Sequence, residues 1–163
     1  MVPFRKEDAR YFHGRDHEIQ NLLTLVRQHH FLAVVGSSGS GKSSLITAGL
    51  LPKLDDPRNF PRGTWRSLSL RPGATPLEDL ARVLGGPPDD SAAAVARSLA
   101  ADPPAQRLLL VVDQFEELFS EVKAAPTRDA FIGRLKALRA DPRCTVILTM
   151  RADFYGDLMN STL

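Results

Sequence analysis

The stretch that decides the fold is Phe31-Leu32-Ala33-Val34-Val35-Gly36-Ser37-Ser38-Gly39-Ser40-Gly41-Lys42-Ser43-Ser44. It begins as an apolar run with two β-branched valines, continues as a loop of glycine and serine, and leads into the helical pattern of residues 45–48. The pattern G-x-x-x-x-G-K-[ST] of the Walker A phosphate loop is matched at Gly36, Gly41, Lys42 and Ser43. Since this motif requires a strand before it and a helix after it, the context favours a phosphate loop over a glycine–serine linker.

The residue types of this loop suit the binding of a polyphosphate. Small residues let successive backbone N–H groups point into one concavity, and the following helix adds its positive end. We expect Lys42 to reach the β- and γ-phosphates, Ser43 to offer its hydroxyl to Mg²⁺, and the Ser44 amide to lie near the α-phosphate. The predicted phosphate-binding residues are Gly36, Ser37, Ser38, Gly39, Ser40, Gly41, Lys42, Ser43 and Ser44.

A second apolar run, Leu108–Val112, ends in Asp113 and has the Walker B pattern. A run of this kind is typical of a parallel strand buried on both faces. Its carboxyl end lies at the edge of the sheet where ligands bind. We therefore predict that Asp113 holds Mg²⁺ opposite Ser43, so that these two residues are the metal ligands.

Two glutamates follow this aspartate within one turn. Either Glu116 or Glu117 can polarise an attacking water, and the pattern does not decide between them. The alternative is that both are ordinary carboxylates in the first turn of a helix, stabilised by the helix dipole.

Two arginines also follow predicted strands. Arg151 comes after the apolar run of residues 145–149, where it can contact a γ-phosphate and report its presence; the alternative is a surface ion pair with Asp153. Arg71 ends its strand in the same way, and for it we favour an ordinary surface position. The predicted catalytic residues are thus Lys42, Asp113, Glu116, Glu117 and Arg151.

Composition bounds the remaining possibilities. The chain has 163 residues, one cysteine and a formal net charge of +2, which suits one α/β domain with a real core. Its basic residues are scattered, so there is no electrostatic case for direct nucleic-acid binding.

No signal-peptide pattern or membrane-spanning run is present, and we expect a cytoplasmic protein in which Cys144 is a small buried hydrophobe. His13 and His17 find no third ligand nearby, so we expect no metal other than Mg²⁺.

Strand and helix patterns alternate along the chain, which predicts a three-layer α/β/α P-loop NTPase fold with a mostly parallel sheet. We expect Pro52 to end the phosphate-loop helix. The chain stops without a terminating loop signal, so we expect a fragment that ends before the last strand of the sheet. The expected strands are residues 31–35, 65–70, 108–112 and 145–149, and the other expected helices are residues 16–28, 76–84, 91–102, 115–122, 127–140 and 153–159.

With these residues in place, the chain resembles the nucleotide-binding domain of STAND ATPases (signal-transduction ATPases with numerous domains), an AAA+/NACHT-like group. It is most similar to the bacterial novel STAND group, and the resemblance covers nearly the whole chain. Residues 12–19 resemble the F-x-G-R-x-x-E-[IL] segment that precedes the phosphate loop in this superfamily. The other signature stretches are residues 65–73, 112–119 and 148–155.

The resemblance implies an ATP/ADP switch that couples nucleotide state to opening and oligomerisation. It implies that residues 1–30 wrap the adenine, with Phe12, Gly14 and Arg15 as binding residues, and that residues 31–163 form the NTPase core. In the family this module precedes a winged-helix arm and a sensor of repeats or a β-propeller, and many bacterial members act in signalling or defence. A full-length protein is then expected to be a Mg²⁺-dependent ATPase, and this fragment to have little or no activity.

Two other functions remain open from the residues alone. One is a P-loop kinase or transferase acting on a small molecule, which would yield a phosphorylated product instead of free phosphate. The other is a non-catalytic scaffold whose nucleotide is purely structural. No N-K-x-D motif of GTPases is present, which agrees with adenine as the base.

Overall fold

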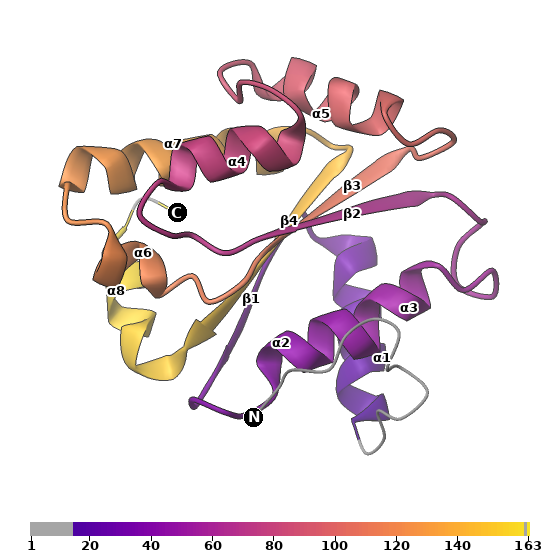
Figure 1. The fold of residues 1–163 in the computed structure, drawn as a ribbon. Coiled ribbons are helices and arrows are strands. Elements are labelled where there is room, and N and C mark those ends of the chain that lie inside the picture. Colours follow the sequence, from indigo (N-terminus) through magenta and orange to yellow (C-terminus); the bar gives the residue numbers. More distant parts are fainter. Residues whose placement is uncertain (1–14, 162) are drawn as a thin grey trace.

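The computed structural model describes residues 15–161 and 163, and it contains a parallel sheet of four strands in the order β1-β4-β3-β2 (Figure 1). The predicted α/β fold with a parallel sheet is therefore confirmed. The strands are β1 (Phe31–Gly36), β2 (Trp65–Leu70), β3 (Arg107–Val112) and β4 (Cys144–Arg151).

Strand register brings the predicted site residues to one edge of the sheet. Gly36 at the end of β1 pairs with Arg151 at the end of β4, and Leu70 at the end of β2 pairs with Val112 at the end of β3. Because all four strands are parallel, the residues that follow them emerge on the same side, where ligands bind in folds of this class.

Helices cover both faces of the sheet (Figure 1). One face is covered by α1 (Asp16–Gln28), α2 (Lys42–Ser44), the π-helix η2 (Leu45–Leu50) and α3 (Leu51–Leu54). The other face carries α4 (Pro76–Leu84), α5 (Ser91–Ala100), α6 (Glu117–Glu121), α7 (Ala125–Ala140), the 3₁₀-helix η3 (Ala152–Phe154) and α8 (Tyr155–Met159).

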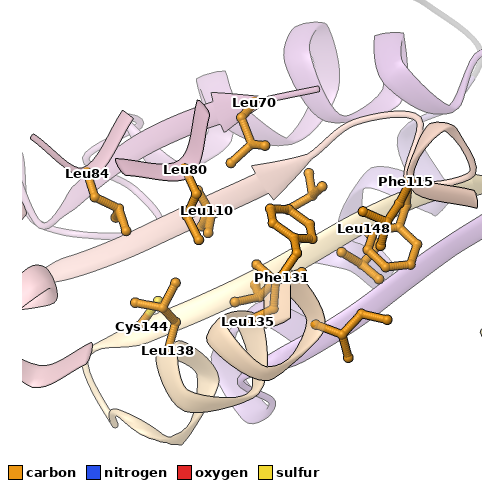
Figure 2. Packing of buried hydrophobic residues seen from close by; sticks show 14 of the residues in the cluster. Leu70, Leu80, Leu84, Leu110, Phe115, Phe131, Leu135, Leu138, Cys144 and Leu148 are labelled. Atoms are coloured by element: carbon orange, nitrogen blue, oxygen red, sulfur yellow. The ribbon is translucent and has the colours of Figure 1, made fainter. Parts of the chain in front are cut away.

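The two faces of the sheet build two hydrophobic clusters. Figure 2 shows the larger one, in which Phe131, Leu135 and Leu138 of α7 lie against the sheet, as their spacing predicts. Cys144 at the start of β4 is fully buried there, and burial raises the pKa of its thiol to about 12. It is therefore the small buried hydrophobe that the sequence predicts.

The prediction that Pro52 ends the phosphate-loop helix is wrong. The helix changes to π-helical bonding over Leu45–Leu50, with the Leu51 N–H donating to the Ile46 carbonyl, and α3 then runs on to Leu54. Leu50 and Leu51 keep right-handed helical backbone angles, so the helix continues into α3, and Pro52 is tolerated in the first turn of that segment.

Other boundaries differ by a few residues. α7 starts at Ala125, two residues earlier than expected, because Pro126 occupies its first turn. α6 starts at Glu117 instead of Phe115 because Gln114 has a left-handed φ of +52° and the chain turns there before the helix. α1 and β2 begin and end as predicted.

The turn between α7 and β4, which leads into the strand that carries Thr149 and Arg151, is held by a pair of Asp141 and Arg143. The Asp141 carboxylate accepts bonds from the Arg143 N–H at 2.8 Å, Nε at 3.0 Å and Nη2 at 2.7 Å. These bonds hold the pKa of Asp141 below its ordinary value of 3.8.

We expect Asp141→Asn to lower the free energy of unfolding by about 1–3 kcal/mol at pH 7, because a partly buried carboxylate loses its charge-assisted bonds. A depressed pKa gives stability that is present above the unfolded-state pKa and is lost as pH falls through the folded-state pKa. Urea denaturation of both proteins from pH 7 down to pH 3 checks this. The difference between the two free energies should shrink as pH falls below about 4, and a constant difference would contradict the assignment.

Candidate functional site

A cavity of about 690 Å³ lies at the edge of the sheet where the strands end. Most of the predicted site residues line it, from the phosphate loop, from the turn after β3 and from the end of β4. The lining residues are Arg15, Ser38, Gly39, Ser40, Gly41, Lys42, Ser43, Ser44, Gln114, Glu116, Glu117, Ser120, Glu121, Thr149, Arg151 and Phe154.

Two glycines set the shape of the loop. A Cβ atom at Gly36 would lie 2.8 Å from the Ser40 Oγ, so the loop folds back closely on the end of β1. Gly41 has a φ of +81°, and a Cβ there would lie 3.0 Å from the Arg15 Nη1. The backbone at Gly41 therefore requires glycine, whereas a side chain at Gly36 would displace the Ser40 hydroxyl.

The Lys42 side chain lies over the start of the loop. Its Nζ donates to the Gly36 carbonyl at 3.1 Å, to the Ser37 carbonyl at 2.8 Å and to the Ser40 Oγ at 3.4 Å. The ammonium is thus held in the cavity by neutral acceptors of its own loop.

Arg15 directly precedes α1, and its side chain contacts the same loop. Its Nη1 donates to the Ser40 carbonyl at 2.8 Å, and its Nε donates to Glu18 at 2.7 Å. This brings a second cation to the phosphate loop from a distant part of the sequence. The other two residues expected to bind the adenine, Phe12 and Gly14, lie outside the described residues.

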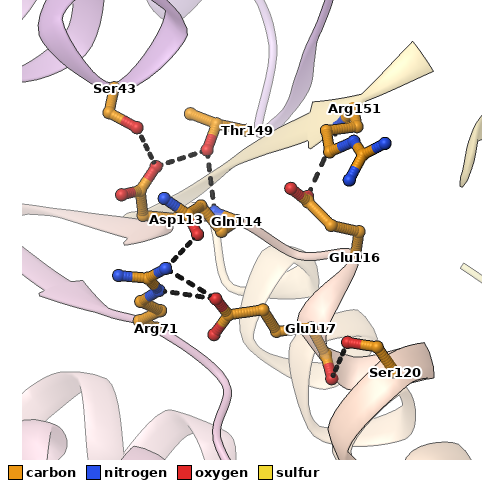
Figure 3. A network of polar contacts seen from close by, with 9 residues as sticks. All are labelled: Ser43, Arg71, Asp113, Gln114, Glu116, Glu117, Ser120, Thr149 and Arg151. Carbon is orange, nitrogen blue, oxygen red and sulfur yellow. Dashed lines mark hydrogen bonds and ion pairs between the residues drawn. The ribbon is translucent and has the colours of Figure 1, made fainter. Parts of the chain in front are cut away.

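Asp113 connects the loop to the sheet through one carboxylate oxygen (Figure 3). Its Oδ1 accepts a hydrogen bond from the Ser43 Oγ at 2.6 Å and another from the Thr149 Oγ1. Thr149 is 1% exposed, and its hydroxyl also accepts the Gln114 N–H at 2.9 Å. The predicted pair of Ser43 and Asp113 is therefore in direct contact.

The two glutamates differ in their surroundings (Figure 3). Glu116 is 8% exposed, and its Oε2 accepts the main-chain N–H of Arg151 at 3.3 Å. Glu117 instead accepts the Arg71 Nε at 2.8 Å and forms an ion pair with that arginine. Bonding to Glu117 raises the pKa of the Arg71 guanidinium, with smaller contributions from Asp113 and Glu116.

The Arg151 side chain lines the cavity but pairs with its neighbour. Its Nη2 lies 2.7 Å from Asp153, and its guanidinium carbon lies 5.6 Å from the centre of the Phe154 ring. The surface ion pair foreseen as the alternative is thus present, with both side chains about half exposed.

The Ser43 hydroxyl and the Asp113 carboxylate suit a hard divalent cation, because both are oxygen ligands. Within residues 15–161 and 163, no group of three or more His, Cys, Asp or Glu side chains can hold a metal ion. A cation here therefore needs oxygen ligands from a bound phosphate and from water, which is typical of Mg²⁺.

Sequence reasoning missed Thr149 and gave too little weight to Gln114 and Arg71. A signal for Thr149 exists, because a threonine near the end of an otherwise apolar buried strand needs a polar partner. Gln114 has no comparable signal, since its partners Arg71 and Thr149 are distant in sequence and nothing local indicates its left-handed backbone. Within the described part of the chain, no helix has both the length and the apolar character needed to span a bilayer.

Comparison with known proteins adds three findings. A family model described as Novel STAND NTPase 1 matches residues 1–163. Among solved structures, the chain is similar to the Aeropyrum pernix ORC2 protein in its ADPNP-ADP complexes, with 16% identity and a TM-score of 0.60. That match covers 93% of this chain and 42% of the other, and at this identity it shows the fold alone. No curated protein sequence matches the chain.

We expect Thr149→Val to lower the free energy of unfolding by about 1–3 kcal/mol, because the Gln114 N–H and the Asp113 carboxylate each lose a buried partner. Thr145→Val is the matched control on the same strand. The Thr145 Oγ1 is buried and has no hydrogen-bond partner among the described residues, so this change should be neutral or stabilising. Urea denaturation measures both, and equal effects would contradict a special role of the Thr149 hydroxyl.

Proposed function

This chain belongs to the Novel STAND NTPase 1 family, and we propose that its cavity binds ATP and ADP together with Mg²⁺. The observation that carries the proposal is the contact of 2.6 Å between the Ser43 hydroxyl and the Asp113 carboxylate, at the mouth of a loop that also holds Lys42. These are the groups that a bound metal–triphosphate requires, and they come from sequence positions 70 residues apart.

A bound phosphate would replace the loop carbonyls as hydrogen-bond partners of the Lys42 ammonium. A phosphate oxygen is charged and is a stronger acceptor than the carbonyls of Gly36 and Ser37. The flexible side chain can therefore turn from these carbonyls to a phosphate without moving the loop. Arg15 adds positive charge on the side of the loop where it contacts Ser40.

Ser43 and Asp113 are the proposed metal ligands, Ser43 directly and Asp113 in the outer shell, through water. Bound Mg²⁺ supplies electrostatic stabilisation of negative charge on the phosphate oxygens. Thr149 keeps the Asp113 carboxylate turned toward Ser43, so the metal site is prepared by the protein itself.

We assign the water-polarising role to Glu116. Its side chain lines the cavity, and among the described residues its Oε2 accepts a bond from a main-chain amide and from no cationic side chain. Glu117 lines the cavity too, but its charge is compensated by Arg71. The burial of Glu116 also keeps its carboxylate largely out of bulk water.

In the proposed switch, Arg151 reads the γ-phosphate. Its pair with Asp153 is half exposed and therefore weak, so a doubly charged terminal phosphate can compete for the guanidinium. Moving a two-state equilibrium from almost fully closed to almost fully open needs about 5.5 kcal/mol of differential binding. A few charge-assisted contacts to one phosphate supply energy of this order.

We propose that this switch is part of a larger protein, in keeping with the family resemblance. We propose that residues 1–30, with Phe12, Gly14 and Arg15, wrap the adenine, and that residues 31–163 are the NTPase core. A winged-helix arm and a sensor of repeats or a β-propeller are the proposed further domains. Opening of the ATP-bound form, self-association and a role in signalling belong to the same proposal.

Lys42→Ala tests the nucleotide site. We expect the dissociation constant of Mg²⁺·ADP to rise about 10- to 100-fold, since charge-assisted bonds to phosphate are lost. Calorimetric titration measures this, with Lys53→Ala on α3, outside the cavity lining, as the matched control. Unchanged affinity in the Lys42 variant would overturn the proposed function.

Glu116→Gln and Glu117→Gln test the hydrolytic assignment in a full-length protein. We expect single-turnover release of inorganic phosphate from ATP to fall about 100-fold or more in the first variant. In the second, the fall should be only a few-fold, because glutamine still accepts a bond from Arg71. Phosphate found on a small-molecule acceptor would support the kinase alternative, and rates unchanged from the wild-type protein in both variants would leave neither glutamate as the water-polarising group.

A further inference from the structure

We propose that Arg71 is a positioning residue of the nucleotide site, which acts on Glu116 without touching it. The inference rests on the proposed function, since it assigns a role within the same site. Arg71 directly follows β2 and contacts two side chains of the turn after β3 (Figure 3). Its Nη2 donates to the Gln114 Oε1 and lies 2.6 Å from the Glu117 Oε1, while its Nε donates to Glu117 at 2.8 Å.

The turn after β3, which Arg71 contacts, has a backbone conformation that other residues must stabilise. Gln114 is the only residue other than glycine with a positive φ in the described part of the chain, at +52°. Such a backbone persists only where its surroundings hold it in place. Thr149 holds the turn from the β4 side, through the Gln114 N–H and through its own carbonyl, which accepts the Phe115 N–H at 2.9 Å. Arg71 holds it from the β2 side.

This turn decides where Glu116 lies. Gln114 directs the chain away from β3, and two residues later the Glu116 carboxylate reaches the Arg151 N–H and the cavity. If the Gln114 backbone relaxed to the ordinary right-handed region, the direction of the following residues would change and this bond would break. Arg71 contacts Gln114 and Glu117, which flank Phe115 and Glu116 in the sequence. These two contacts therefore fix the position of Glu116.

A plain surface ion pair does not account for this arrangement. The Arg71 side chain is 58% exposed and that of Glu117 is 23% exposed, so their pair adds little to stability. A pair of that kind needs no third partner, whereas Arg71 also bonds to the side chain of the strained residue. The planar guanidinium with its several donors suits this double contact, which a lysine cannot reproduce.

Amide hydrogen exchange of the 163-residue chain, followed by NMR, tests the inference directly. The Gln114 amide reports the turn, and the Arg151 amide reports the Glu116 carboxylate that accepts its bond. We expect Arg71→Gln to speed exchange at both amides about tenfold or more, and Arg71→Lys to give an intermediate effect. Glu116→Ala removes the acceptor of the Arg151 N–H and leaves the Gln114 amide bond in place. It therefore gives the largest increase in exchange expected at Arg151, against which the Arg71 variants are compared.

Two further variants make the test specific. Gln114→Gly accepts the left-handed backbone without strain, so in the double variant with Arg71→Gln exchange at Arg151 should return toward the wild-type rate. Arg134→Gln breaks another exposed pair, with Asp89 at 2.7 Å, and should leave both amides unchanged. The midpoint of thermal unfolding should stay nearly constant in Arg71→Gln, because the pair is exposed.

The inference is overturned if Arg71→Gln leaves exchange of both amides within twofold of the wild-type chain. It is also overturned if exchange rises equally throughout β4, since the role of Arg71 would then be general stability. Mg²⁺·ADP titration of Lys42→Ala in parallel separates the two proposals. Loss of binding in Lys42→Ala with unchanged exchange in Arg71→Gln removes only this inference, while unchanged binding removes the proposed function.

Discussion

The site depends on one carboxylate oxygen that accepts hydrogen bonds from hydroxyl groups of two other elements. The Asp113 Oδ1 accepts bonds from Ser43, at the start of the phosphate-loop helix, and from Thr149, near the end of β4. A partly buried carboxylate is costly unless donors surround it, so the three elements are stable only in this mutual arrangement. The position of the loop relative to the sheet therefore follows from a requirement of solvation, before any ligand is considered.

Around this centre, charged side chains are held in pairs that cost little to rearrange. The guanidinium groups of Arg15, Arg71 and Arg151 each have a carboxylate partner close in space. These pairs lie at the rim, where water screens them and their net energy is small. The deeper groups have main-chain or hydroxyl partners instead. Such a division keeps the centre fixed and leaves the rim free to exchange partners with an anionic ligand.

Much of this could be predicted from the sequence, because periodicity and motif spacing report local structure. The parallel sheet, the contact between Ser43 and Asp113, and the cavity shared by the loop and the glutamates follow from strand ends that meet at one edge. The continuation of the helix through Pro52 could not, since it depends on a change to π-helical bonding with no local signal. Nor could the distinct surroundings of the glutamates. They depend on Arg71, whose distance from them in sequence hides the contact.

The bond from the Arg151 N–H to Glu116 has a consequence for how this protein is studied. The donor is a main-chain amide, so every replacement of Arg151 except proline keeps it. Alanine scanning can therefore remove the guanidinium while leaving the mechanical link between β4 and the turn after β3 intact. Breaking this link requires a change of its acceptor, as in Glu116→Ala, or of the peptide group of Arg151 itself, as in amide-to-ester replacement.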